Sequence, residues 1–201
     1  MKFNFDKMLE RHGKDAIAVD GLGTIPGKSP DKAKEGFDSI PMWIADMNFP
    51  TAPSIQDEVI KRVNHPAFGY FAPTDQYFDA IINWHKDRKN VHDIKPCHIG
   101  YENGVLGGVI SALNVFCSRG DKVLVHSPTY IGFTNSLENN GYNIILSELI
   151  KDENGKWVMD YEDMEKKIVD EKISATIMCN PHNPTGRVWT KDELKKAVDI
   201  F

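Results

Sequence analysis

The feature that most restricts the fold is an apolar run at residues 173–178, followed by a loop rich in proline and asparagine. The run is mostly β-branched and apolar, which is typical of a buried strand in a parallel sheet. The loop at residues 179–187 contains two prolines, two asparagines and a glycine, so the strand must end there. A helical pattern begins near Thr190 and Asp192. We therefore expect a strand, loop and helix unit of an α/β sheet.

The position of this loop makes it a candidate for binding. In an open α/β sheet, ligands bind beside the loops that leave the carboxyl ends of the strands. Asn183 lies among the prolines of the loop and can present its side-chain amide to a pocket. The alternative interpretation is an ordinary strand-to-helix connection, and the loop alone does not separate the two.

The rest of the chain alternates between helical and strand patterns. Residues 1–40 are polar and rich in turns, and we expect them to form an arm. Apolar residues at helical spacing predict helices over residues 54–63, 75–89, 105–116, 131–139 and 161–171. Apolar and β-branched runs predict strands at residues 42–50, 94–101, 121–126 and 142–149. This βαβ alternation predicts an α/β fold with a largely parallel sheet and helices on its faces.

Three strand-to-helix loops would open on the same edge of such a sheet. The first, at residues 103–105, places Gly104 at a helix start, where free backbone N–H groups favour an anion such as phosphate. The second, at residues 127–130, offers the ring of Tyr130 for stacking, and the third offers the amide of Asn183. Together they describe a site for a phosphorylated aromatic cofactor. Singly, the glycine is more often a cap and the tyrosine a core residue.

Other classes of function find little support. The formal net charge is −5 and no basic stripe occurs, which argues against nucleic-acid binding. The spacings GxGxxG, GxxxxGK[ST], GxSxG and HExxH are absent, so dinucleotide, P-loop, hydrolase and metal sites are disfavoured. No apolar run approaches the ~20 residues of a membrane span, and no signal peptide is evident. Three scattered cysteines fit reduced thiols in the cytoplasm.

Two further features carry expectations. Asp46 lies in an apolar segment, and we expect it either to be paired or to cap a turn. Residues 191–201 form an amphipathic helical pattern that stops without a cap, glycine or proline. We therefore expect the chain to be an N-terminal fragment of a longer protein.

One motif resembles a known family. The motif consists of Asn180, Pro181, His182, Asn183, Pro184, Thr185 and Gly186, and it resembles the Asn-Pro-x-Asn-Pro-Thr-Gly signature of fold-type I, pyridoxal-phosphate-dependent class I/II aminotransferases. The segments at residues 43–49 and 68–70, with His182 and the Arg187-Val188-Trp189 extension, resemble the MalY/PatB subgroup of cystathionine or cysteine-S-conjugate β-lyases. That subgroup usually has Asp where this chain has Asn48. The resemblance runs from about residue 5 to residue 201.

The resemblance implies a role for each of six residues. Asn183 would donate to the phenolic oxygen of the cofactor pyridoxal 5′-phosphate, and Tyr130 would stack on its ring. Gly104 and Val105 would bind the phosphate through backbone N–H groups. The resemblance also implies a homodimer with shared active sites, in which Tyr70 would reach the phosphate of the neighbouring subunit. Ala45 would lie near the substrate carboxylate.

The resemblance also implies what this chain lacks. The family needs a Schiff-base lysine, whose motif lies downstream of the asparagine-proline loop, and only fifteen residues follow Gly186. We therefore assign no catalytic residue and no metal ligand. Residues 1–53 would be an arm and part of the small domain. Residues 54–201 would be the first, incomplete part of the large cofactor-binding domain of a truncated, three-layer fold-type I transferase.

The implied activity is a carbon–sulfur β-lyase that converts cystathionine or cysteine S-conjugates to a thiol, pyruvate and ammonia. An amino-acid aminotransferase would use the same residues and stays an alternative. A third possibility is that the chain by itself is a non-catalytic fragment.

Overall fold

The computed structural model describes residues 3–27 and 29–201, which fall into two compact units. The first unit comprises residues 1–73 and the second residues 74–201. Each unit is considered by itself below.

The first unit has little regular structure. It contains the short helix α1 (Ile17–Asp20) and the helix α2 (Pro53–Val63), joined by turns and extended segments. Proline at the first helical position starts α2, because its missing N–H would be unpaired there in any case. A small core gathers around α1, where Ala16, Ala18 and Leu22 are buried. The indole N–H of Trp43 donates to the carbonyl oxygen of Ala18 and ties the later segment to this core.

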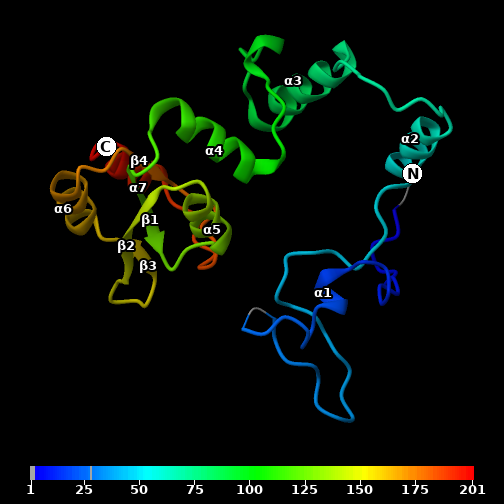
Figure 1. The fold of residues 1–201 in the computed structure, drawn as a ribbon, viewed down its shortest axis with the longest axis horizontal. Helices are drawn as coiled ribbons and strands as arrows, with labels where there is room; N and C mark the ends of the chain where they lie inside the picture. Colours follow the sequence, from blue (N-terminus) through cyan, green and yellow to red (C-terminus); the bar gives the residue numbers. More distant parts are fainter. Residues whose placement is uncertain (1–2, 28) are drawn as a thin grey trace. The chain divides into compact units, whose positions relative to one another are not determined.

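The second unit begins with helical elements and continues as an α/β sandwich (Figure 1). Helix α3 (Asp75–Lys89) ends at Asn90, whose φ of 55° is left-handed, as is common at helix ends. The 3-10 turn η1 (Pro96–His98) and helix α4 (Gly104–Phe116) follow. The remaining helices are α5 (Ile131–Asn139), α6 (Tyr161–Glu171) and α7 (Lys191–Val198).

The sheet has four strands in the order β3-β2-β1-β4. Strand β1 (Lys122–Ser127) pairs in parallel with β2 (Asn143–Lys151) on one side and with β4 (Ala175–Ile177) on the other. Strand β3 (Trp157–Met159) adds an antiparallel edge beside β2. The predicted largely parallel α/β sheet is confirmed.

Two cores lie on opposite faces of the sheet, because successive side chains of a strand point to opposite faces. One core contains Val123 and Val125 of β1 with Leu113 of α4 and Leu137 of α5. The other combines the end of β2 with α6, α7 and the segment that follows the proline loop; it contains Leu149, Met159, Met164, Trp189 and Ala197. The unit therefore has the three layers expected from the sequence, with α5 and α6 on opposite sides of the sheet (Figure 1).

Two predicted strands are wrong. Residues 42–50 form bends and extended chain, because their hydrogen bonds go to Arg11 and Leu9 rather than to a neighbouring strand. Residues 94–101 are interrupted by η1, where Pro96 has no N–H to give to a ladder and the chain turns. The antiparallel strand β3 and the four-residue helix α1 were not predicted. Both are short and depend on partners that are distant in sequence.

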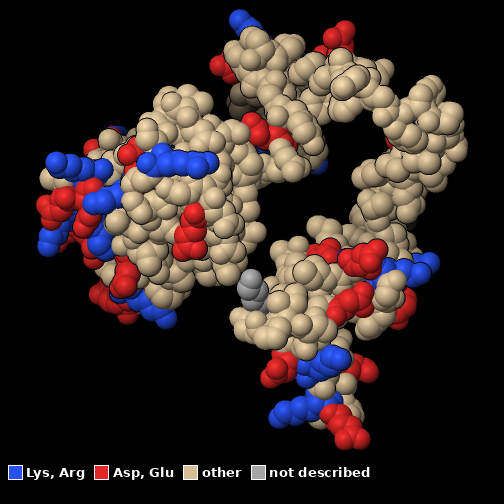
Figure 2. Space-filling model, viewed as in Figure 1, with Lys and Arg blue, Asp and Glu red and all other residues tan. Residues whose placement is uncertain are grey.

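The surface of the second unit carries charges of both signs. Figure 2 shows acidic and basic side chains intermixed over the side of the unit that carries α6. Several of them pair within one helix, as Lys167 does with Asp163 and Lys195 with Asp199. Among the described residues, the helices are too short or too polar to span a bilayer.

Candidate functional site

The strand order reverses at β1, so that β1 and β4 end side by side at the carboxyl edge of the sheet. The chain runs from β1 through α5 to β2 on one side, and later through α6 to β4 on the other side of β1. These two connections cover opposite faces of the sheet. Such a topological switch point is where open α/β sheets bind ligands. The loop that leaves β1 leads to Tyr130, and the loop that leaves β4 leads to Asn183, so the two predicted residues share this edge.

The ring of Tyr130 is held close to the start of α5. A Cβ atom on Gly132 would lie 2.3 Å from the Tyr130 ring, so only glycine leaves room for the ring there. Phe133 packs edge to face on the same ring, with centroids 5.5 Å apart. The tyrosine is 38% exposed, so part of the ring stays available for stacking. The Gly132 Cβ would also meet Leu106 at 3.0 Å, which places the first turn of α4 beside Tyr130.

The first turn of α4 partly fits an anion. Gly104 has a φ of 81°, which favours glycine, and no atom lies within 4 Å of where its Cβ would be. Its N–H donates to the carbonyl oxygen of Glu102 at 2.9 Å. The Asn103 side chain makes no cap hydrogen bond, and no acceptor among the described residues takes the N–H of Val105. The first free backbone N–H group at the start of α4 is therefore that of Val105.

The loop after β4 is held in place by its own hydrogen bonds. The N–H of His182 donates to the carbonyl oxygen of Arg187, and the N–H of Gly186 donates to that of His182, which closes a turn over residues 182–187. His182 is buried, and its Nδ1 lies 2.9 Å from the Oγ1 of Thr185. Its ring packs edge to face on Trp189, with centroids 5.7 Å apart. The turn is thus a fixed support for residues 183–185.

The two asparagines of the loop differ in their contacts. The side-chain oxygen of Asn180 accepts from the backbone N–H of Trp189 at 3.1 Å, so Asn180 is part of the support. The side chain of Asn183 is exposed and makes no hydrogen bond within the described part of the chain. An amide on a rigid turn with its donors free fits the oxygen of a ring bound at this edge of the sheet.

A buried polar group lies beneath this edge of the sheet. His126, on the α6 side of β1, is 2% exposed, and neither ring nitrogen has a hydrogen-bond partner in the described structure. Burial, and secondarily the nearby His182, lowers the pKa of His126 to about 4, and burial also lowers the pKa of His182. Across the same face, the hydroxyl of Ser147 donates to Asp163 at 2.9 Å. Both histidines are therefore neutral packing residues near neutral pH.

Ala45 and Tyr70 belong to the first unit, and both are exposed there. The segment that follows Ala45 is held by Arg11, which pairs with Asp46 at 2.6 Å and donates to the Met47 carbonyl oxygen and the Asn48 side chain. The Arg11 guanidinium holds the pKa of Asp46 below its usual value. Asp46 also accepts the N–H of Met47, so it is paired, which is one of the two expected alternatives.

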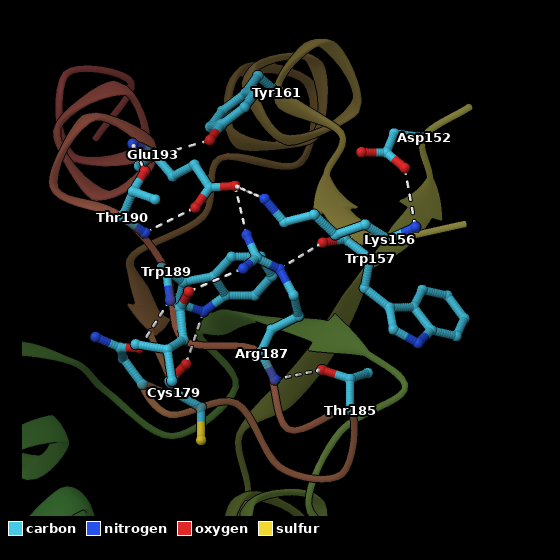
Figure 3. Close-up of polar contacts among 12 residues, drawn as sticks. Asp152, Lys156, Trp157, Tyr161, Cys179, Thr185, Arg187, Trp189, Thr190 and Glu193 are labelled. Carbon is cyan, nitrogen blue, oxygen red and sulfur yellow. Dashed lines mark hydrogen bonds and ion pairs between the residues drawn. The ribbon is translucent and has the colours of Figure 1, made fainter. Parts of the chain in front are cut away.

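The sequence did not assign a role to the contacts behind the proline loop. Arg187 binds Glu193, and Glu193 forms a capping box with Thr190 at the start of α7 (Figure 3). The Thr-x-x-Glu spacing of Thr190 and Glu193 is a signal that could have located this helix start. No group of three or more metal-binding side chains occurs in the part of the chain that the structure describes.

Known proteins resemble this chain over its whole length. It is 34% identical over 197 residues to a cystathionine β-lyase of Bacillus subtilis, PatB, and the match covers 98% of this chain and 48% of that protein. A carbon–sulfur lyase from Staphylococcus hominis, solved with pyridoxal phosphate bound, superposes with a TM-score of 0.81 at 30% identity and covers 100% of this chain and 48% of its own. Cystalysin from Treponema denticola, which contains a pyridoxal 5′-phosphate cofactor, gives a TM-score of 0.84 at 32% identity, with coverage of 100% and 49%.

The chain thus spans about half the length of the relatives it matches. The resemblance seen in the asparagine-proline motif extends well beyond the motif itself. The family model described as aminotransferase class I and II matches residues 44–201, which include the sheet and the three loops at residues 103–105, 127–130 and 180–186. On this evidence the chain belongs to the class I and II aminotransferase family.

Proposed function

We propose that the protein is a pyridoxal-phosphate-dependent carbon–sulfur β-lyase that acts on cystathionine or cysteine S-conjugates. The substrate and one water would give a thiol, pyruvate and ammonia. The observation that carries the proposal is the shared carboxyl edge of β1 and β4, where Tyr130 has a partly exposed ring and Asn183 a free amide. The similarity to PatB and to the Staphylococcus hominis enzyme supports the lyase over other reactions of the family.

The proposed roles follow the donors that the structure leaves free. The N–H of Val105, with Gly104 beside it, would bind the phosphate, and the dipole of α4 would favour its charge. Tyr130 would stack on the pyridine ring, and the Nδ2 of Asn183 would donate to the phenolic oxygen. When bound, pyridoxal phosphate supplies an electron sink that stabilises negative charge on the substrate α-carbon.

The roles of the two residues in the first unit are proposed from the resemblance. Ala45 would lie near the substrate carboxylate, with Arg11 holding the segment that follows it. Tyr70 would reach the phosphate of a neighbouring subunit, so the proposal includes a homodimer with shared sites. The three cysteines are free, which fits the reducing conditions of the cytoplasm, the proposed location.

An aminotransferase is the second candidate, because the matched family is named for that reaction and the same residues would serve it. The Schiff-base lysine is not assigned to any residue of this chain. We therefore expect the 201-residue chain to be inactive when it is produced alone.

The test combines binding and product analysis on the intact protein. Pyridoxal phosphate is added, binding is followed by absorbance, and L-cystathionine is then supplied while pyruvate and thiol are measured. Release of both supports the lyase, whereas oxo-acid formation that depends on an added oxo-acid acceptor would establish the aminotransferase instead. The variants Asn183→Ala and Asn180→Ala form a matched pair. The first should weaken cofactor binding, by about tenfold for one charge-assisted hydrogen bond. The second should mainly lower stability.

A further inference from the structure

Arg187 occupies the buried side of the proline loop, and its side chain contacts β3, α7 and the residues that follow it in the chain. Its Nε donates to the carbonyl oxygen of Trp157 in β3 at 2.7 Å, and its Nη1 donates to that of Val188 at 2.8 Å. Its Nη2 pairs with Glu193 in α7 at 2.5 Å. The guanidinium also lies 4.6 Å from the centre of the Trp189 ring. One side chain therefore joins the loop to a strand and to a helix.

The partner of Arg187 is itself fixed. Glu193 accepts the N–H of Thr190 at 2.7 Å, and its own N–H donates to the Thr190 hydroxyl at 3.2 Å. Burial acts to raise the pKa of Glu193, but the hydrogen bonds from Thr190 and Arg187 outweigh it and hold the pKa below its usual value. Figure 3 shows these contacts between β3 and α7, with the Nζ of Lys156 3.9 Å from the same Glu193 oxygen that Arg187 binds.

The backbone of Arg187 is hydrogen-bonded to residues on both sides of Asn183. The Arg187 carbonyl oxygen accepts the N–H of His182 at 2.7 Å, so the residue before Asn183 is bonded directly to Arg187. The Arg187 N–H in turn faces the Thr185 hydroxyl at 3.4 Å, on the other side of Asn183. Asn183 thus lies on a turn whose base is anchored by Arg187, while its own side chain makes no bond in the described structure.

We propose that Arg187 is a positioning residue for the amide of Asn183. By tying the base of the turn to β3 and α7, it holds the amide at the orientation that meets the cofactor ring. Arg187 does not itself contact the cofactor. This inference rests on the proposed function, because it requires a pyridoxal ring bound beside Asn183. Lysine cannot replace Arg187, because a single ammonium group does not offer the same planar set of donors.

The test uses the intact protein, pyridoxal phosphate and the variants Arg187→Lys and Asn183→Ala, alone and combined. Two quantities are measured: the dissociation constant of the cofactor and the pH midpoint of the absorbance change of bound cofactor. Asn183→Ala should move the pH midpoint and weaken cofactor binding by about tenfold. Arg187→Lys should move the midpoint in the same direction and weaken cofactor binding by about threefold to tenfold. In the Asn183→Ala background, Arg187→Lys should add less than about twofold, because its effect passes through the amide.

A purely structural role would lower the melting temperature and leave the midpoint where it is. An unchanged midpoint in Arg187→Lys, or effects that add fully in the double variant, would overturn the inference. Glu193→Gln provides a milder change that keeps an acceptor for Thr190, and it should move the midpoint in the same direction by a smaller amount. Lys195→Gln is the matched control, because it removes an exposed ion pair with Asp199 in the same helix.

The cofactor site and the positioning role of Arg187 can be refuted separately. If the unaltered protein does not bind pyridoxal phosphate, or if Asn183→Ala changes neither quantity, the proposed site is wrong and the inference falls with it. If Asn183→Ala moves the midpoint while Arg187→Lys and Glu193→Gln do not, the site stands and the positioning role alone is refuted.

Discussion

The indole N–H of Trp189 donates to the carbonyl oxygen of Cys179 at 2.9 Å, which closes the proline loop against the segment that leaves β4. The indole is buried, at 3% exposure, and it belongs to the core under α6 and α7. The same residue therefore packs the core and satisfies a carbonyl group that the end of the strand leaves without a ladder partner.

The first prediction concerns this contact. Trp189→Phe keeps an aromatic ring but removes the donor and leaves a gap, so we expect a loss of about 1–3 kcal/mol in the free energy of unfolding. Urea denaturation of the intact protein measures the loss. Trp84→Phe is the control, because Trp84 is 57% exposed on α3 and should change the stability by less than about 0.5 kcal/mol. Equal losses in the two variants would show that the contact with Cys179 contributes nothing.

The second prediction concerns the loss of folding stability at low pH. The pKa of His126 is lowered from 6.5 to about 4. Between these pH values, the imidazole is therefore protonated in the unfolded chain and neutral in the folded chain. Stability is therefore fully present above pH 6.5 and falls as the pH decreases toward 4, by roughly 2–3 kcal/mol from this group. His182, whose pKa is also lowered, acts in the same direction. Asp163 and Glu193, whose pKa values are lowered from 3.8 and 4.5, add their losses at still lower pH.

Unfolding measured from pH 7 to pH 4.5 checks this window. His126→Leu removes the titrating ring and should flatten the decline by roughly 2 kcal/mol, whereas exposed His65→Gln should leave it unchanged. A decline of the same size in His126→Leu would mean that other groups cause the acid sensitivity.

The third prediction separates backbone strain from cofactor binding. Gly104 and Gly155 both have positive φ values, 81° and 75°, and an added Cβ meets no atom within 4 Å at either position. Alanine should cost about 1 kcal/mol of stability at each position. Only Gly104→Ala should also weaken pyridoxal-phosphate binding, because only Gly104 lies at the start of α4. Isothermal titration with the cofactor compares the two variants, and equal affinities would remove Gly104 from the phosphate site.

The fourth prediction concerns the segment after Ala45. Arg11→Gln removes the donors that bind Asp46, the Met47 carbonyl oxygen and Asn48, so these residues should open more readily. We expect amide hydrogen exchange at Leu9 and Met47, whose N–H groups donate to Asn48 and Asp46, to rise by about tenfold, the equivalent of one lost hydrogen bond. Arg62→Gln is the control, since Arg62 binds the carbonyl oxygens of His65 and Ala67 instead. Unchanged exchange in Arg11→Gln would show that the segment keeps its conformation without the arginine.

Much of the second unit could be predicted from the sequence because its signals are local. The helices at residues 75–89 and 161–171 coincide with α3 and α6, since the spacing of their apolar residues repeats at the helical period. Strand β1 was predicted to within a residue, because Val123, Leu124 and Val125 form an unbroken apolar run. The asparagine-proline motif indicated the family, and the match over residues 44–201 confirmed it.

The failures share one physical cause. Whether an extended segment becomes a strand depends on a partner that the local sequence does not contain. Residues 42–50 have the apolar character of a strand, but Arg11 donates hydrogen bonds to their polar groups. Residues 157–159 have only three residues of signal, yet they form β3 because the end of β2 pairs with them.

The sequence by itself determined the fold class, the family and the candidate residues Asn183, Tyr130 and Gly104, because periodicity and a contiguous motif are written into neighbouring positions. Only the tertiary structure decided which of the two asparagines is free and which is structural, since that depends on the backbone N–H of Trp189 reaching Asn180. It also decided that Arg187 holds the loop, because its partner Trp157 lies 30 residues earlier and meets it only when β3 has paired. Contacts of this kind arise from the packing of distant segments, and no local pattern of residues specifies them.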